Sequence, residues 1–303
     1  MGMTNFPNGL PGGVSLYGQV AGPGTSGSTY FVDGDSGHDG HNGTSWEDAF
    51  KTLAVAFAAS HADIARGADR WARRNTIYIS GGWFTETLVA FPQKTDVIGV
   101  GSADGFKGAG ITGLTAPINT AFGTRFFNVN FRSVAAGALM TLTAATAGAE
   151  FHGCSFHGNG STSAATTAID ATACNFLKVI GCDFTGAFTG DVIDIGAGAV
   201  DETTIQGNKI IGGANDGIVE TGTATITGTR RGLIADNYIS VAARAIVTNA
   251  TSVWDVINNR MISAAAVGSG SYVIDLSFAC GNLLTGADNA VMIPPWSVIA
   301  TTI

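Results

Sequence analysis

The sequence predicts an all-β protein: a single-stranded right-handed parallel β-helix, or solenoid, with a capping helix near its N-terminus. Two sets of short repeats, and the alternation of residues within them, are the observations behind this prediction. The first repeat is a small or polar residue, any residue and a large apolar residue, and its copies begin at Val129, Cys154, Cys182, Asn208, Asn237, Asn259 and Asn282. The intervals are 25, 28, 26, 29, 22 and 23 residues, within the range of solenoid coils.

The second repeat falls between copies of the first, at a similar interval. Its copies are the segments 139–142, 168–170, 192–195, 218–220, 246–248 and 273–276. Segments of both sets are short and alternate apolar with polar residues, so that each strand has one apolar face. One coil cannot bury this face alone, but stacked coils put like residues over like residues at about 4.8 Å. We therefore expect two short strands in each coil.

The composition fits a solenoid with a large core. Hydrophobic residues make up 45% of the 303 residues and charged residues 13%, so extensive disorder is not expected. The 43 glycines follow no G-x-y period, which excludes collagen and indicates many tight turns.

Charge and cysteine usage narrow the possible partners. The net charge of −8 argues against nucleic acid, because such binding depends on Lys and Arg neutralising phosphates. The cysteines, at positions 154, 174, 182 and 280, lack the spacing of a zinc site. Neither a secretion signal nor a membrane-spanning segment is visible in the sequence. We therefore expect a protein that folds in a cytoplasm with reduced thiols and contacts no membrane.

Four segments are predicted along the chain. Residues 1–28 contain three prolines and many glycines, and form an irregular N-terminal arm that a partner would order. Residues 29–75 form an N-terminal cap with one amphipathic helix. Residues 76–286 form the right-handed parallel β-helix, and residues 287–303 form a C-terminal tail.

The cap helix is expected to start at a capping box, Ser45-Trp46-Glu47-Asp48. Apolar residues then recur at roughly helical spacing, at Phe50, Leu53, Phe57 and Ile64. Since the open end of a solenoid exposes an apolar coil, we expect this helix to cover it.

Stacking the first repeat places one column of residues inside a turn of the solenoid. The column is Cys154, Cys182, Asn208, Asn237, Asn259 and Asn282. Stacked Asn amides can hydrogen-bond one another and the nearby backbone, and Cys fills the same place as an apolar residue. We interpret this column as a structural ladder without a catalytic role.

An outward-facing acidic column is the sharpest candidate for chemistry. If Met140, Ile169, Ile193, Val219, Val247 and Ile274 point inward, the next residues out are Thr141, Asp170, Asp194, Glu220, Thr248 and Asp275. Asp170, Asp194 and Glu220 would then lie on successive coils, about 5 Å apart. Carboxylates at this separation suit a retaining glycosidase or a calcium ion.

The alternative is an acidic stripe on a solvated or subunit-facing surface, met by arginines of a partner. Arg230, Arg231, Arg244 and Arg260 are the candidate arginines. A shift of one residue at Glu220 would dissolve the column.

Other residue groups resemble metal sites less closely. The loop with Asp33, Asp35 and Asp39 resembles a calcium loop, but its glycine is misplaced and position 44 is Thr. A turn rich in Asp, Asn and Gly explains it without an ion. The group His152, Cys154 and His157 includes a ladder residue. We predict neither a metal nor a cofactor.

Three segments between residues 30 and 101 form a recognisable series: Tyr30–Ser45 with its Val-Asp and Gly/Asn/Asp loop, Ala49-Phe50-Lys51-Thr52-Leu53, and the strand 76–82 that ends in a glycine turn. Together they resemble the entry of pectin-lyase-like β-helix proteins. The resemblance implies the fold, but not a function, because this fold carries lyases, hydrolases, tailspikes and inert structural proteins.

The opening residues are Thr4, Asn5, Phe6, Pro7 and Asn8, followed by Gly9. They resemble the start of virion structural proteins of tailed bacteriophages, in which a short arm precedes a β-helix. This resemblance implies a homotrimeric particle protein in the virion, assembled in the host cytoplasm, whose arm binds the major capsid protein or another virion protein.

Three functional hypotheses therefore remain open. The first is a non-enzymatic head decoration protein. The second is a tailspike-type depolymerase of host surface polysaccharide, with Asp170, Asp194 and Glu220 as catalytic residues. The third is a receptor-binding module that binds a host glycan without chemistry.

Overall fold

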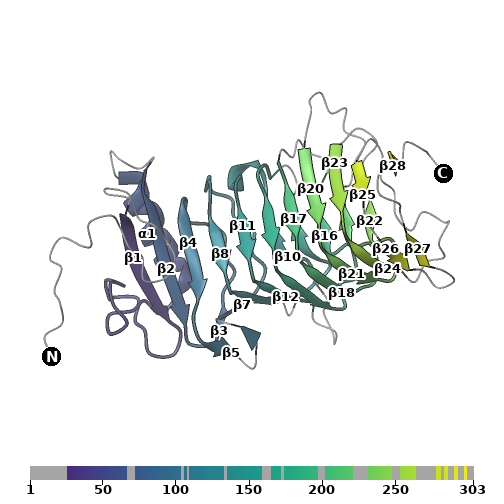
Figure 1. Ribbon diagram of the computed structural model, residues 1–303. Helices are drawn as coiled ribbons and strands as arrows, with labels where there is room; N and C mark the ends of the chain where they lie inside the picture. Colours follow the sequence, from purple (N-terminus) through teal and green to yellow (C-terminus); the bar gives the residue numbers. More distant parts are fainter. Residues whose placement is uncertain are drawn as a thin grey trace, which may run out of the picture.

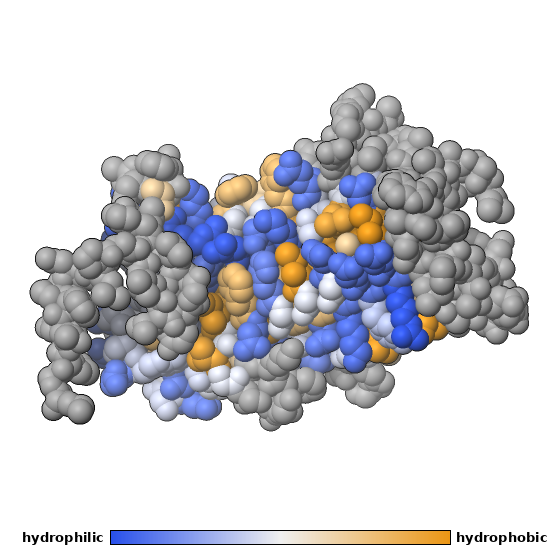
Figure 2. All heavy atoms as spheres, in the orientation of Figure 1, coloured by the Kyte–Doolittle hydropathy of each residue, from blue (hydrophilic) through white to orange (hydrophobic). Residues whose placement is uncertain are grey.

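The computed structural model describes residues 26–66, 72–103, 106–107, 109–132, 135–158, 165–171, 174–196, 202–220, 231–247 and 253–263, and four short strands between 278 and 298. Over these residues the chain is an elongated stack of coils, with one α-helix beside β1 and β2 at one end (Figure 1). Nearly all strand pairs are parallel, so the predicted parallel β-helix is confirmed. Hydrophobic residues reach the surface of the central coils among hydrophilic ones (Figure 2).

The strands form three long sheets, which we number 1 to 3. Sheet 1 has, in spatial order, β1 (Ser26–Asp33), β2 (Arg74–Ser80), β4 (Thr95–Gly99), β8 (Arg125–Phe127), β11 (Glu150–His152), β14 (Lys178–Ile180), β17 (Thr204–Gln206), β20 (Arg231–Ala235), β23 (Val253–Ile257), β25 (Phe278–Cys280) and β28 (Ser297–Val298). All its pairs are parallel except β25 with β28.

Sheets 2 and 3 follow sheet 1 along each coil. Sheet 2 has β3 (Trp83–Thr85), β7 (Gly110–Thr112), β9 (Asn130–Arg132), β12 (Ser155–Gly158), β15 (Asp183–Gly186), β18 (Lys209–Gly213), β21 (Tyr238–Val241), β24 (Arg260–Ser263), β26 (Leu283–Thr285) and β27 (Ala290–Met292), the last pair antiparallel. Sheet 3 has β10 (Ala138–Thr141), β13 (Thr167–Asp170), β16 (Ile193–Asp194), β19 (Ile218–Val219) and β22 (Ile246–Val247). A small antiparallel pair, β5 (Ser102–Ala103) and β6 (Phe106–Lys107), and a 3-10 helix, η1 (Ala144–Thr146), complete the described elements.

Each complete coil has three strands, so the prediction of two strands was wrong. From β8 onward, each sheet 1 strand is separated from the following sheet 2 strand by only two residues, as at Gly153 and Cys154 between β11 and β12. A corner this short merges two strands into one sequence segment, and the first repeat marks the corner and the start of the second strand.

The corner is made by a left-handed backbone residue directly before the ladder position. These residues are Asn128, Gly153, Gly181, Gly207, Asp236 and Asn258, with φ between 54° and 66°. Gly, Asn and Asp tolerate this conformation best. The sequence therefore repeats Gly, Asn or Asp at this place because each coil must turn there.

The helix α1 spans Leu53–Arg66 and buries Leu53, Phe57 and Ile64 against the first coils. The predicted start at Ser45–Asp48 was wrong: the Ser45 hydroxyl accepts a hydrogen bond from the Asp48 amide, but this bond lies in a turn. Phe50 is buried and forms a bridge with Val32 rather than a helical turn.

The helix is instead capped by residues distant in sequence. The Leu53 and Ala54 amides donate to the Glu86 carboxylate at 2.8 and 3.0 Å, and the Lys51 and Thr52 amides donate to Asp39. Carboxylates satisfy the free amides of a helix N-terminus and favour its positive dipole end. Glu86 therefore fixes the cap on the first coil.

The predicted arm has only its last residues in the described part. Residues 26–28 belong to β1 rather than to an irregular segment. Thr4, Asn5, Phe6, Pro7 and Asn8 lie outside the described residues, as does Asn282.

Candidate functional site

The ladder column forms a continuous chain of hydrogen bonds in the later coils. Asn208 donates from its backbone amide and from Nδ2 to Oδ1 of Asn237, both at 2.9 Å. Asn237 repeats this with Oδ1 of Asn259, at 3.0 and 2.8 Å. Nδ2 of each Asn also donates to a sheet 1 carbonyl, namely Val179, Ile205 and Ile234 in turn. All three Asn are buried.

The two ladder cysteines lie in the same place with weaker bonds. Both are buried, and their Sγ atoms lie 3.5 Å from the carbonyl oxygens of Phe126 and Phe151 respectively. The Cys182 amide donates to Oδ1 of Asn208 at 2.8 Å, which joins the two halves of the column. Burial raises the pKa of the Cys182 thiol well above its usual value, and the neighbouring Cys154 raises it further. These geometries give the described ladder residues a structural role.

The acidic column is shorter than predicted. Asp170 of β13 pairs with Asp194 of β16, but the next partner of Asp194 is Val219 and not Glu220. Val219 in turn pairs with Val247, while Ile193 pairs with Ile218, which pairs with Ile246. The register is thus one residue away from the prediction. The isoleucines point inward at these coils, and the valines continue the outward column.

Glu220 lies just beyond β19 and is buried. Its Oε2 accepts a hydrogen bond from Nε1 of Trp254 at 3.0 Å, and the residue is 8% exposed. The Trp254 ring lies against Gly232, where any Cβ would clash at 2.1 Å. A glycine on β20 therefore makes room for the indole, and Glu220 accepts the hydrogen bond from its N–H.

A second acidic group lies at the turn between sheets 2 and 3. Asp216 is 1% exposed, and the Arg244 guanidinium holds both of its carboxylate oxygens. The neighbouring Asp191 accepts from the Asn215 amide group and from the Asp216 amide. Burial raises the pKa of Asp191, and the charges of Asp216 and Asp194 add to this effect while the Asp216 amide opposes it.

The arginines expected to meet a partner's carboxylates are partly used within the chain. Arg244 pairs with Asp216, and the Arg260 guanidinium lies 5.6 Å from the ring centroid of Tyr238. Arg230, the side chain of Arg231, and residues Thr248, Ile274 and Asp275 lie outside the described residues.

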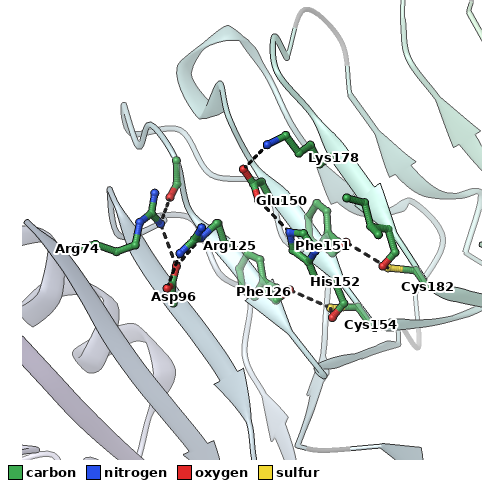
Figure 3. A network of polar contacts seen from close by, with 12 residues as sticks. Arg74, Asp96, Arg125, Phe126, Glu150, Phe151, His152, Cys154, Lys178 and Cys182 are labelled. Carbon is green, nitrogen blue, oxygen red and sulfur yellow. Dashed lines mark hydrogen bonds and ion pairs between the residues drawn. The ribbon is translucent and has the colours of Figure 1, made fainter. Parts of the chain in front are cut away.

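The outer face of sheet 1 carries a charged column that the sequence did not reveal (Figure 3). Asp96, Arg125, Glu150 and Lys178 occupy one register position on four adjacent strands, so their charges alternate. Asp96 is fully buried and accepts from Arg125 twice at 2.6 Å and from Arg74 at 2.9 Å. The acids and bases are therefore paired from coil to coil.

Glu150 is the electrostatic centre of this column. It accepts from Lys178 at 3.1 Å and is bonded to His152 at 2.9 Å. Burial favours the neutral acid, but the bonds from His152 and Lys178 outweigh it and lower the pKa of Glu150 to about 2. The His152 ring also stacks on Phe127 at 4.8 Å. The ion pairs Asp96–Arg125 and Glu150–Lys178 therefore link neighbouring coils.

The two residue groups that resemble metal sites in the sequence lie in turns and on different faces of the solenoid. Asp33 Oδ1 accepts from the Asp35 and Ser36 amides, and Asp39 caps the entry to α1. His152 lies on the outer face of sheet 1, whereas His157, on sheet 2, is bonded to Thr185. Within the described residues, no group of three or more His, Cys, Asp or Glu could hold a metal ion.

Aligning segments of the sequence that are one coil apart would have found the charged column, because residues 125, 150 and 178 each begin a sheet 1 strand. The column was overlooked because the prediction did not include these sheet 1 strands.

Comparison with family models, curated proteins and solved structures found no match. In the part of the chain that is described, no helix has the length and hydrophobicity to cross a membrane.

Proposed function

We propose that this chain is a non-enzymatic structural protein of a tailed-bacteriophage virion: a homotrimeric head decoration protein attached through its N-terminal arm. The observation that carries the non-enzymatic reading is the environment of Glu220. It is buried and bonded to Trp254, so it cannot join Asp170 and Asp194 in a row of outward-facing acids. The location in a virion rests on the resemblance of the opening residues.

The paired charges of sheet 1 support the same proposal. Each carboxylate of the charged column is bonded to a base on an adjacent strand. A catalytic acid or base needs a pKa near the working pH, whereas the pKa of Glu150 is lowered to about 2. Glu150 therefore stays ionised and paired with Lys178, which suits a structural role better than proton transfer.

The tailspike-type depolymerase stays as a second candidate because of one pair of residues. Asp170 and Asp194 face outward on adjacent parallel strands, in register. Their carboxyl groups can approach the separation of about 5 Å that a retaining glycosidase uses. A receptor-binding module without chemistry would use the same face to bind a host glycan.

Immunogold labelling of phage particles with an antibody to this protein tests the proposal. Gold spread over the head is the expected result, and gold confined to the tail tip would overturn it. A chain lacking residues 1–25 should bind heads far more weakly than the full chain while keeping its oligomeric state. Degradation of host surface polysaccharide by the wild type, lost in Asp194→Asn, would establish the depolymerase instead.

A further inference from the structure

The turns that lead from the sheet 3 side of each coil into sheet 1 form a strip without charge. Across four successive coils they are residues 87–93, 116–123, 142–148 and 174–177, and they contain no Asp, Glu, Lys, Arg or His. We call this strip the uncharged edge. Hydrogen bonds such as Ile118 amide to Val89 carbonyl (3.0 Å) and Gly148 amide to Asn175 carbonyl (2.7 Å) stack these turns on one another.

Large hydrophobic side chains are exposed along the uncharged edge. Among the residues that the structure describes, five large hydrophobics are exposed, and four of them are Val89 (54%), Ile118 (85%), Phe122 (51%) and Phe176 (39%). The Phe122 ring lies over the next coil, 3.3 Å from where a Cβ of Gly148 would stand. These side chains therefore lie on stacked turns and follow one another along the solenoid axis, and they are not isolated on separate parts of the surface.

Phe176 is held on this edge at a conformational cost. Its φ is +60°, and the equivalent positions of the neighbouring coils also have positive φ: Lys94 (+46°), Gly123 and Gly148 (both +73°) and Glu202 (+52°). Glycine adopts this conformation freely, and a bulky side chain is strained in it. The turn therefore requires this conformation in each of these coils, and at Phe176 it holds a large ring on the exposed edge.

We infer that the uncharged edge is the surface through which copies of this chain associate side by side. Monomeric proteins rarely expose a contiguous apolar patch of this kind. Each copy carries a net charge of −8, so two copies repel, and repulsion is least where the facing turns contain no acidic residue. A strip parallel to the solenoid axis also lies against identical strips when copies surround a common axis. This inference rests on the proposed homotrimer and names its contact surface.

Ile118→Asp and Phe122→Asp test the inference in the full-length chain. Each places a carboxylate in the apolar contact, where association would have to remove it from water, so we expect association to weaken about a hundredfold or more. The mass measured by sedimentation equilibrium should fall from that of an oligomer to that of a monomer. Unchanged oligomers in both variants, or a monomeric wild-type chain, would overturn the inference.

Matched substitutions separate assembly from folding. Ala144→Asp lies on the edge and Ala242→Asp lies at the turn between sheets 2 and 3, and both positions are exposed. Only Ala144→Asp should dissociate the oligomer, and dissociation by both would overturn the inference. Phe176→Gly relieves the strained backbone, so it should weaken association without lowering the unfolding temperature.

Failure of this inference is distinguishable from failure of the proposed function. Edge variants that stay trimeric on a protein found on heads refute only the edge. Gold at the tail tip together with monomeric edge variants refutes only the decoration role.

Discussion

The coils between residues 125 and 186 and those between 204 and 263 build the same backbone with different interiors. In the first region Phe126 stacks on Phe151 at 5.4 Å, and Phe156 stacks on Phe131 and Phe184 at 4.9 and 4.8 Å. In the second region the equivalent positions hold aliphatic side chains, all buried: Ile205, Ile234 and Val256 on sheet 1, and Ile210, Ile239 and Met261 on sheet 2.

The polar bonds along sheet 1 and its corner differ between the two regions. The first region is joined to its neighbours and within itself on the outer face of sheet 1, through Asp96–Arg125 and Glu150–Lys178. The second region has Thr204 and Leu233 at that register position. Its coils are joined inside the corner through the amides of Asn208, Asn237 and Asn259, and at the turn between sheets 2 and 3 through Asp216–Arg244.

The comparison teaches that the ladder side chain does not make the corner. The ladder residue is Cys in the first region and Asn in the second, and in both it directly follows a left-handed residue, such as Gly153 or Asp236. The left-handed residue turns the backbone. The ladder residue then lies against the sheet 1 carbonyl groups inside the corner, to which Asn donates a hydrogen bond and Cys makes a weaker contact. Each region can therefore be broken by a different substitution.

Phe156→Ala should have the largest effect, since Phe156 lies between two stacked rings in the first region. We expect a loss of about 4 kcal/mol in the free energy of unfolding, from lost burial and the cavity left behind. Urea unfolding followed by circular dichroism measures it. Ile239→Val, at the equivalent place in the second region, should cost only about 1 kcal/mol. Equal losses would contradict the difference between the two interiors.

Asn237→Ala should break the second region at its corner. It removes the acceptor of two Asn208 hydrogen bonds and the donor to the Ile205 carbonyl. Buried groups left unsatisfied cost about 1–3 kcal/mol each, and we expect a total loss of about 3 kcal/mol in the free energy of unfolding, measured in urea.

Cys154→Ala is the counterpart of Asn237→Ala in the first region. A thiol is a weak donor, so we expect a loss of about 1 kcal/mol. The comparison would be refuted by a Cys154→Ala variant as unstable as Asn237→Ala.

Glu220→Ala should leave the Trp254 N–H without this acceptor and cost about 2 kcal/mol in the free energy of unfolding. Glu220→Gln keeps an acceptor oxygen and should cost less than half as much. Thermal unfolding of the two variants measures the difference. Equal destabilisation by Gln and Ala would mean that the carboxylate charge, and not the bond to the indole, fixes Glu220.

The repeat made most of the fold predictable. Intervals of 22–29 residues and period-two alternation identified stacked coils, and the ladder column followed from residues such as Cys182 and Asn208. The third strand was missed because a two-residue corner leaves no gap between strands. A strand such as Ile218–Val219 is too short to show which of its apolar residues points inward, so the register at Glu220 could not be decided from the pattern.

The start of the cap helix and the charged column depended on contacts between distant residues. Glu86 caps α1 from 33 residues downstream of Leu53, and a local capping pattern at Ser45 gives no sign of it. The column needs residues more than 20 positions apart to be aligned, as Asp96 and Arg125 are. Exposure of Ile118 and Phe122 likewise follows from tertiary structure, because both residue types are usually buried.

Acid should weaken the first region before the second, through Glu150. The pKa of Glu150 is about 2 in the folded chain against a usual 4.5, so the folded state holds this carboxylate ionised more strongly than the unfolded state does. Its stabilisation is therefore fully present above about pH 4.5 and is lost as the pH falls toward 2. Because the group is partly exposed, the loss is about 1 kcal/mol after solvent screening. Lys178→Met should flatten this part of the pH dependence of the unfolding temperature, whereas Lys209→Met, on sheet 2, should leave it unchanged. A wild-type curve that is flat between pH 4.5 and pH 2 would show that the outer ion pairs do not hold the first coils together.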